Sequence, residues 1–332
     1  MKFLFLSCLW LLSLPAVFSQ RPVQPRQPAE GPGGAEYCCS GVMVVDSANA
    51  AGGYWIYQPA EVLPDTAPLV IFLHGFGCYN PMIYGKWIRH LVGKGNVVIM
   101  PRYQNRLLQP RASEFSDVVA GSILRAMDYL RQHSDTPVGF DRPVLIGHSY
   151  GGVLAADLLL HFSEKKLPKP AAALICQAGT NIFRGGRVRN YEGFPGDVNL
   201  LLVVAKNDLL VSRRISKQIF RNTAHLNNRD MLILNHDRHG RPPLAAGHRS
   251  CHATDPAFDN GVRTFSARYA LFHIPTDAAD YYGYWKLADA LIDCTLRNTN
   301  CESAFGGTPA QTGLGRWSDG IPVEPLRPWT PN

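Results

Sequence analysis

The chain has 332 residues, of which 46% are hydrophobic and 18% charged, an ordinary globular composition with enough length for one large domain or two small ones. The formal net charge is +7, but the basic residues are spread along the chain, and we interpret the local cluster Arg184, Arg187 and Arg189 as a solvated face. The sequence contains no nucleic-acid-binding module and no basic–aromatic repeat, so we expect no nucleic-acid partner.

The first residues have the pattern of a cleaved signal peptide. Lys2 is followed by an apolar run from Phe3 to Val17, and small side chains follow near Ser19. The run is nearer fifteen residues than the roughly twenty that span a bilayer, so we expect a secreted or periplasmic protein with no stable membrane span. We divide the chain into a signal peptide (1–19), a flexible leader rich in Pro, Gly and Gln (20–36), one α/β domain (37–300) and a C-terminal tail (301–332).

Beyond Tyr37, short apolar runs alternate with helix-like segments. The expected strands are 53–59, 68–73, 96–100, 143–146, 171–176, 200–205 and 231–234, and the expected helices are 84–95, 115–132, 152–162, 212–222 and 284–296. This alternation predicts an α/β fold, with a mostly parallel central sheet and helices on both faces. The segment 179–197 is short for a cap domain, so we expect little or no cap and an open cleft, unless 103–113 or the loop after Asp237 supplies a lid.

The most informative motif is Gly147-His148-Ser149-Tyr150-Gly151, between an expected strand and an expected helix. A serine on a strained strand-to-helix turn needs small residues two positions before and after it, because a side chain there would collide with the neighbouring backbone. The turn points the hydroxyl into a cleft and leaves the amide of Tyr150 facing the same space. The motif predicts that Ser149 is a nucleophile for acyl transfer.

A serine hydroxyl needs an imidazole to take its proton and a carboxylate to orient that imidazole. Asp208 follows the expected strand 200–205 and is the candidate acid. The loop after the next strand holds four histidines, and His236 leaves too little chain to fold back over the cleft. We choose His248, since Gly247 gives the backbone freedom to aim the ring, while His239 and His252 stay open as alternatives.

Charge that develops on a carbonyl oxygen needs two preorganised donors. One candidate is the amide of Tyr150, and the other is the amide of Phe76, in the glycine-containing turn His74-Gly75-Phe76-Gly77 after an expected strand. The residues beside these donors are the candidates for contact with substrate: His74, Gly75, Gly77, Tyr79 and His148.

The cysteines fit an oxidising compartment. Without Cys8 in the signal peptide, seven are left, and we predict a disulfide between Cys294 and Cys301, with Cys176 free in a buried strand. The histidine-rich loop contains neither Cys-x-x-Cys nor His-Glu-x-x-His, so we predict no metal site and no cofactor.

With these motifs and the order Ser149, Asp208, His248, the chain resembles the α/β-hydrolase superfamily over roughly residues 40–296. It is similar to the lid-poor secreted esterases of the chlorophyllase-like, cutinase-like and dienelactone-hydrolase-like groups. The resemblance implies a secreted serine hydrolase that cleaves carboxylic esters through an acyl-enzyme, with an open cleft for bulky, lipid or polyester substrates. Two alternatives stay open: a peptidase or acyltransferase with the same triad, and a catalytically inactive binding protein. The sequence does not indicate an oligomeric state.

Overall fold

The computed structural model describes residues 21–108, 110–180, 190–273 and 275–331. The expected signal peptide and the cluster of Arg184, Arg187 and Arg189 lie outside the described residues.

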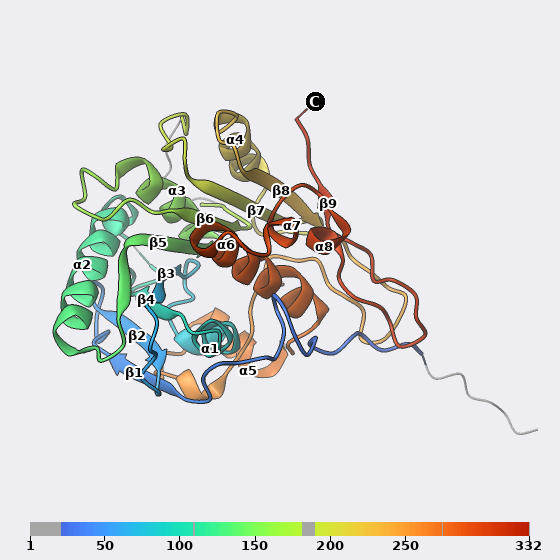
Figure 1. Cartoon of the computed structure of the whole chain (residues 1–332), viewed down its shortest axis with the longest axis horizontal. Coiled ribbons are helices and arrows are strands. Elements are labelled where there is room, and N and C mark those ends of the chain that lie inside the picture. The colour runs from blue at the N-terminus through green and yellow to red at the C-terminus, as the bar shows by residue number, and fades with distance from the viewer. Residues whose placement is uncertain (1–20, 109, 181–189, 274, 332) are drawn as a thin grey trace, which may run out of the picture.

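Parallel strands form the centre of a nine-stranded sheet (Figure 1). The strands lie in the order β1-β2-β4-β3-β5-β6-β7-β8-β9, and the pairs β1–β2, β2–β4 and β8–β9 are antiparallel. The strands are β1 Val42–Asp46, β2 Tyr54–Pro59, β3 Ala67–Leu73, β4 Val97–Pro101, β5 Val138–His148, β6 Ala172–Cys176, β7 Asn199–Ala205, β8 Arg229–Leu234 and β9 Arg327–Pro328. Central strands buried on both faces need continuous apolar runs, and every residue of β3 is buried.

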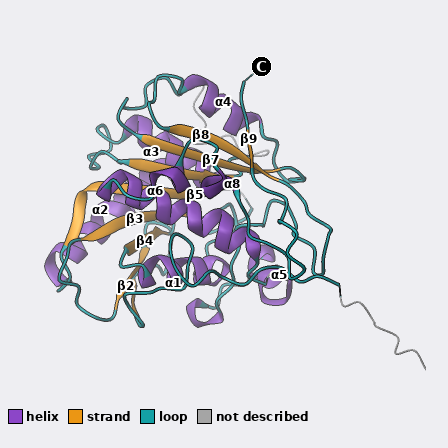
Figure 2. Ribbon diagram, turned by 45° about the vertical axis from the view of Figure 1, so that its right-hand side comes forward, coloured by secondary structure: helices purple, strands orange, loops and turns teal. Residues whose placement is uncertain are grey.

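Helices cover both faces of this sheet (Figure 2). α1 and α6 pack on one face, and α2, α3 and α4 pack on the other. Their bounds are α1 Gly85–Gly93, α2 Phe115–His133, α3 Tyr150–His161, α4 Arg214–Asn222 and α6 Lys286–Arg297. Alternate side chains of β3 serve the two cores, since Val70 lies in the first and Leu69 and Ile71 in the second. The predicted α/β fold is therefore confirmed.

Several elements were not expected from the sequence. β1 is an edge strand whose Met43 and Val44 are exposed, so it lacks the alternation that marks a half-buried strand. α5 (Phe265–His273) exposes Phe265 and Phe272 and presents no apolar stripe on one side. The other unexpected elements are short: η1 (Pro81–Tyr84), η2 (Ala112–Glu114), η3 (Pro256–Phe258), the π-helix η4 (Ala279–Trp285), α7 (Cys301–Ala304), α8 (Pro309–Thr312) and β9.

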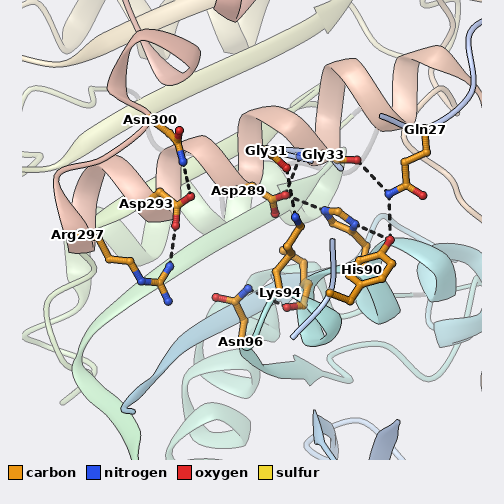
Figure 3. Close-up of polar contacts among 12 residues, drawn as sticks. Gln27, Gly31, Gly33, His90, Lys94, Asn96, Asp289, Asp293, Arg297 and Asn300 are labelled. Carbon is orange, nitrogen blue, oxygen red and sulfur yellow. Dashed lines mark hydrogen bonds and ion pairs between the residues drawn. The ribbon is translucent and has the colours of Figure 1, made fainter. Parts of the chain in front are cut away.

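The N-terminal segment lies against the domain, which differs from the flexible leader expected from its composition. The amide of Gly33 donates to Asp289 Oδ2 of α6 (2.8 Å), and His90 Nε2 lies 2.8 Å from the same oxygen (Figure 3). Gln27 Nε2 donates to the carbonyl of Gly33 (3.0 Å), and Lys94 Nζ donates to the carbonyl of Gly31 (3.2 Å). The segment was expected to be flexible because its composition offers little apolar surface to bury. It is held instead by hydrogen bonds to residues that are distant in sequence, which composition does not show.

The C-terminal tail is also tied to the domain. Trp317 is 1% exposed and donates from Nε1 to Asp237 Oδ2 (2.9 Å), while Trp329 lies edge-on to Phe220 of α4. The predicted disulfide between Cys294 and Cys301 is present and joins the end of α6 to the tail. Cys176 is buried and free, as predicted. Among the residues with described positions, no helix combines the length and the apolar character needed to cross a membrane.

Lys286 of α6 anchors the tail from inside the domain. The lysine is 7% exposed, and its Nζ donates to the carbonyls of Ala310 (2.9 Å) and Gly313 (2.7 Å). Burial lowers its pKa from the usual 10.5 to about 7. Between these values the unfolded chain binds more protons at this site than the folded protein does, so this lysine makes stability rise as the pH rises through that window.

We therefore expect Lys286→Met to flatten the pH dependence of stability on the alkaline side. Between pH 7.5 and 9.5, the free energy of unfolding of the wild type should rise relative to that of the variant by about 2 kcal/mol. Urea denaturation of both proteins at the two pH values measures this difference. Parallel pH slopes for wild type and variant would contradict the assignment.

Candidate active site

Ser149 lies in a tight turn between the end of β5 and the start of α3. Its backbone angles are φ 56° and ψ −118°, a conformation that non-glycine residues rarely adopt. A Cβ on Gly147 would lie 2.7 Å from the carbonyl carbon of Gly151, and a Cβ on Gly151 would lie 2.5 Å from the carbonyl oxygen of His74. The start of α3 lies so close to the end of β5 at Gly147, and to the end of β3 at Gly151, that only glycine fits at both positions, as the sequence motif indicated.

The side chain of Ser149 meets His248 and Asp208 at this turn. Ser149 Oγ lies 2.9 Å from His248 Nε2, and His248 Nδ1 lies 2.7 Å from Asp208 Oδ2. A carboxylate at Nδ1 favours the tautomer with the proton on that nitrogen, which leaves Nε2 free to accept the serine proton. The structure thus brings together the three residues named from the sequence, in the geometry that activates a serine hydroxyl.

Asp208 is held by the loop that follows β7. Its Oδ1 accepts the amides of Leu210 and Val211, both at 2.9 Å, while Oδ2 faces His248. The carboxylate is 3% exposed, so these hydrogen bonds and the imidazole replace water around it. Both oxygens are fixed, and the carboxylate can in turn fix the orientation of the His248 ring.

The backbone of His248 is held by a hydrogen bond from the ring of His148, the residue before the nucleophile. His148 Nε2 lies 2.9 Å from the carbonyl oxygen of His248, and His148 Nδ1 lies 2.8 Å from the hydroxyl of Tyr84. Burial holds the pKa of His148 well below its usual value, with the charge of His248 adding to the effect. A neutral ring satisfies both contacts, because Nε2 donates to the carbonyl and Nδ1 accepts from Tyr84.

Tyr84 is the residue of this network that sequence reasoning missed. Its hydroxyl donates to His148 and accepts the amide of Gly75 (3.0 Å), so it connects the turn after β3 to the nucleophile turn. The residue follows Asn80-Pro81, where the side chain of Asn80 caps η1 by accepting the amide of Met82. The Asn80-Pro81 pair indicates in the sequence that a helix begins there, but it does not specify the position of the Tyr84 hydroxyl.

The turn after β3 packs directly on Ser149. A Cβ on Gly75 would lie 3.3 Å from Ser149 Cβ and 3.1 Å from His148 Nδ1, so glycine is needed for this approach. The amide of Gly75 is bound by Tyr84, and the amide of Gly77 donates to Gln104 Oε1 (2.7 Å). Phe76 lies between them and is partly exposed, with its ring 6.3 Å from that of Tyr150.

Three residues expected to contact substrate have other surroundings. His74 is fully buried, stacks on Tyr103 with ring centroids 4.0 Å apart, and has a pKa lowered to about 3 by burial. His148 supports the His248 loop, as described above. Tyr79 is 5% exposed and donates from its hydroxyl to the carbonyl of Asn105 (3.3 Å). In the structure Tyr79 and His148 make hydrogen bonds to other loops, and His74 Nδ1 lies 2.8 Å from the carbonyl oxygen of Gly75.

The other histidines of the 235–252 loop lie outside the serine's reach. His239 Nε2 lies 2.7 Å from Asp319 Oδ2 at the surface, and His236 is partly exposed near the end of β8. His252 is 2% exposed and packs against Tyr84 and His148, with ring centroids 5.2 and 5.1 Å away. Burial holds its pKa well below the usual value, so its ring is neutral. Of the histidines with described positions in this loop, His248 is the one placed against Ser149.

A cavity of about 1000 Å³ opens beside His248. Leu209 and Leu210 line it from the loop after β7, and Pro242, Pro243 and Ala245 line it from the loop after β8. The second loop is the one after Asp237 that the sequence analysis named as a source of a lid. The N-terminal segment adds Val23–Gln27 to the wall, so a stretch expected to be flexible helps to shape the cavity. Within the described parts of the chain, no group of three metal-binding side chains was found.

The close packing at the serine turn predicts that Gly151→Ala cannot keep this geometry. The new Cβ would overlap the carbonyl oxygens of Leu73 and His74, so α3 would have to move away from the end of β3. We expect a loss of stability of about 2 kcal/mol or more, measured by urea denaturation. The matched control is Gly196→Ala, because a Cβ there meets nothing within 4 Å. Equal stability of the two variants would contradict the packing argument.

Comparison with known proteins agrees with the fold. A family model described as the alpha/beta hydrolase family matches residues 70–301, a range that begins within β3 and extends beyond α6. No curated protein matches the chain significantly. The family match extends over more than half of the sequence, and the chain belongs to the alpha/beta hydrolase family.

Proposed function

We propose that this protein is a secreted serine esterase that cleaves carboxylic esters through an acyl-enzyme intermediate. The observation that carries the proposal is the chain of contacts from Ser149 Oγ to His248 (2.9 Å) and from His248 to Asp208 (2.7 Å), at a strained turn, with His248 also on the wall of the cavity. A hydrogen-bonded nucleophile, base and orienting acid is the geometric signature of covalent acyl transfer.

In the first step Ser149 attacks the ester carbonyl while His248 Nε2 accepts the serine proton. Asp208 keeps the ring oriented and stabilises the imidazolium that forms. His148 and His252 lie beside this ring and stay neutral because burial lowers their pKa values, so neither adds positive charge next to the imidazolium. His248 then gives the proton to the leaving alcohol, and the acyl group stays on Ser149.

Two amides are proposed to bind the oxyanion of the tetrahedral intermediate. Tyr150 starts α3 directly after the nucleophile, where helix amides point toward the turn. Phe76 belongs to the turn that packs on Ser149, and Tyr84 fixes that turn through the amide of Gly75. In the second half of the reaction, His248 activates a water that releases the acid by the same steps in reverse.

The nature of the cavity supports a bulky ester as substrate. Two leucines, four prolines and two tyrosines are among the residues that line it, and Leu209 is 95% exposed. Export is supported by the N-terminal sequence and by the disulfide between Cys294 and Cys301, since structural disulfides persist in oxidising compartments.

We expect Ser149→Ala to abolish hydrolysis of p-nitrophenyl butyrate and to prevent labelling by a fluorophosphonate probe. Loss of the nucleophile removes the covalent step and should lower kcat by a factor on the order of 10⁶. The matched control is Ser163→Ala at an exposed position, which should react and be labelled like the wild type. Ester turnover that survives Ser149→Ala would reject the assignment, and turnover of amides in place of esters would move it to a peptidase.

A pair of histidine variants tests the base. His248→Ala should lower kcat to near the level of Ser149→Ala, because the serine loses its proton acceptor. His239→Ala removes a histidine of the same loop whose ring contacts Asp319 at the surface, and it should leave kcat within about twofold. A large loss of kcat in His239→Ala, with His248→Ala still active, would overturn the assignment.

A further inference from the structure

Two cysteines that are adjacent in the chain hold their sulfur atoms in contact, away from the candidate active site. Cys38 Sγ lies 3.0 Å from Cys39 Sγ. A movement of about 1 Å by these atoms would reach the S–S bond length of about 2.05 Å. Both residues line a cavity of about 700 Å³ that the N-terminal segment helps to form through Gln27 and Tyr37. The spacing of the two sulfur atoms indicates that a bond can form between them.

The backbone on each side of the pair is held by hydrogen bonds. The amide of Cys38 donates to the carbonyl of Gly93 at the end of α1 (2.9 Å), and Cys38 Sγ lies 3.3 Å from the same oxygen. On the other side, the amide and the hydroxyl of Ser40 donate to Glu61 Oε1 (3.2 and 2.5 Å). The turn is therefore fixed at both ends, and it keeps the two thiols facing each other.

The two thiols differ in their access to a reagent in solution. Cys38 is exposed, whereas Cys39 is 6% exposed. Burial, together with the hydrogen bond between the two thiols, raises the pKa of Cys39 to about 12, so this thiol keeps its proton at neutral pH. The other free cysteines with described positions, Cys78, Cys176 and Cys251, are at most 4% exposed. A reagent therefore reaches Cys38 first.

We propose that Cys38 and Cys39 are a thiol-oxidation site at which a disulfide forms between the two neighbouring residues, by exchange with a small-molecule disulfide such as oxidised glutathione. The thiolate of Cys38 attacks one sulfur of the glutathione disulfide, forms a mixed disulfide and expels one glutathione thiolate. Cys39 then attacks Cys38 Sγ and expels the second glutathione thiolate. Each leaving thiolate takes up the proton that one cysteine releases. Two cysteine thiols are oxidised, and one glutathione disulfide is reduced to two thiols.

The bond at this site is easier to reduce than an ordinary structural disulfide. The Cα atoms of neighbouring residues joined by a trans peptide are about 3.8 Å apart, whereas those of ordinary disulfides are about 4.4–6.8 Å apart. A disulfide outside this range is strained and therefore more readily reduced. The Cα atoms of Cys294 and Cys301 are 4.7 Å apart, within the ordinary range. Oxidation of Cys38 and Cys39 is thus reversible, and it does not depend on the proposed esterase function.

Oxidation of the full-length wild-type protein tests the site. The protein is treated with a mild reductant, freed of it and incubated with oxidised glutathione. It is then denatured, alkylated with iodoacetamide and mapped by peptide mass. We expect the peptide with Cys38 and Cys39 to lose two hydrogen atoms and to carry neither glutathione nor an alkyl group, while Cys78, Cys176 and Cys251 are alkylated. Glutathione that stays on Cys38, an unreacted pair, or a bond from either residue to another cysteine would overturn the proposal.

Two matched variants test the order of the steps. Cys39→Ser removes the thiol that resolves the mixed disulfide, so glutathione should accumulate on Cys38. Cys38→Ser leaves only the buried thiol, so no glutathione should be bound at this position. Adducts in both variants, or in Cys38→Ser alone, would contradict the assigned roles. The wild-type result decides whether the bond forms, whether or not the Cys39→Ser protein folds.

A titration with dithiothreitol tests how easily the bond is broken. In the oxidised wild-type protein, the bond between Cys38 and Cys39 should be reduced at a dithiothreitol concentration about tenfold or more below that needed for Cys294–Cys301. Mass mapping after alkylation distinguishes the two bonds in the same sample. Reduction of both at the same concentration, or of Cys294–Cys301 first, would overturn the reversible character of the site.

Discussion

The close approach of α3 to the end of β5 at Gly147, and to the end of β3 at Gly151, is the constraint on which the rest of the site depends. It holds Ser149 at a positive φ that costs free energy, and the surrounding sheet maintains this conformation because β5 is buried between β3 and β6. Since parallel strands all end at the same edge, the turns after β3, β5 and β7 meet there. The tight turn at Ser149 therefore places the serine next to the turns after β3 and β7, at the same edge of the sheet.

His148 and Tyr84 turn this alignment into a defined geometry. The neutral imidazole of His148 binds the carbonyl of His248, and the hydroxyl of Tyr84 binds both His148 and the amide of Gly75. These two side chains therefore connect three segments: the loop that carries His248, the turn that carries Ser149 and the turn after β3. Charging His148 would convert its Nδ1 from an acceptor into a donor and break the link to Tyr84, so the low pKa that burial gives this histidine is part of the support.

The sequence predicted the central strands, the packed helices and the residues gathered at the serine turn, because each leaves a local mark. A buried parallel strand is an uninterrupted apolar run, and the turn at Ser149 admits only glycine at two positions. Other features depend on contacts between distant segments. The packing of residues 21–34 comes from partners such as Asp289 and His90, and the position of the Tyr84 hydroxyl comes from the path of the turn after β3. The pattern along the chain contains neither kind of contact, and for the same reason it did not indicate the hydrogen bonds that Tyr79 and His148 make to other loops.

The part played by Val23–Gln27 in the wall of the cavity has a consequence if the proposed export signal is cleaved. The shape of the cavity depends on residues that closely follow the proposed signal, so the position of the cut would then determine how a ligand fits. Removal of a few more residues would leave Ser149, His248 and Asp208 in place and yet widen the cavity that His248 lines. Two forms of the same polypeptide that differ only in where a peptidase cut them would thus share one reaction chemistry and differ in selectivity.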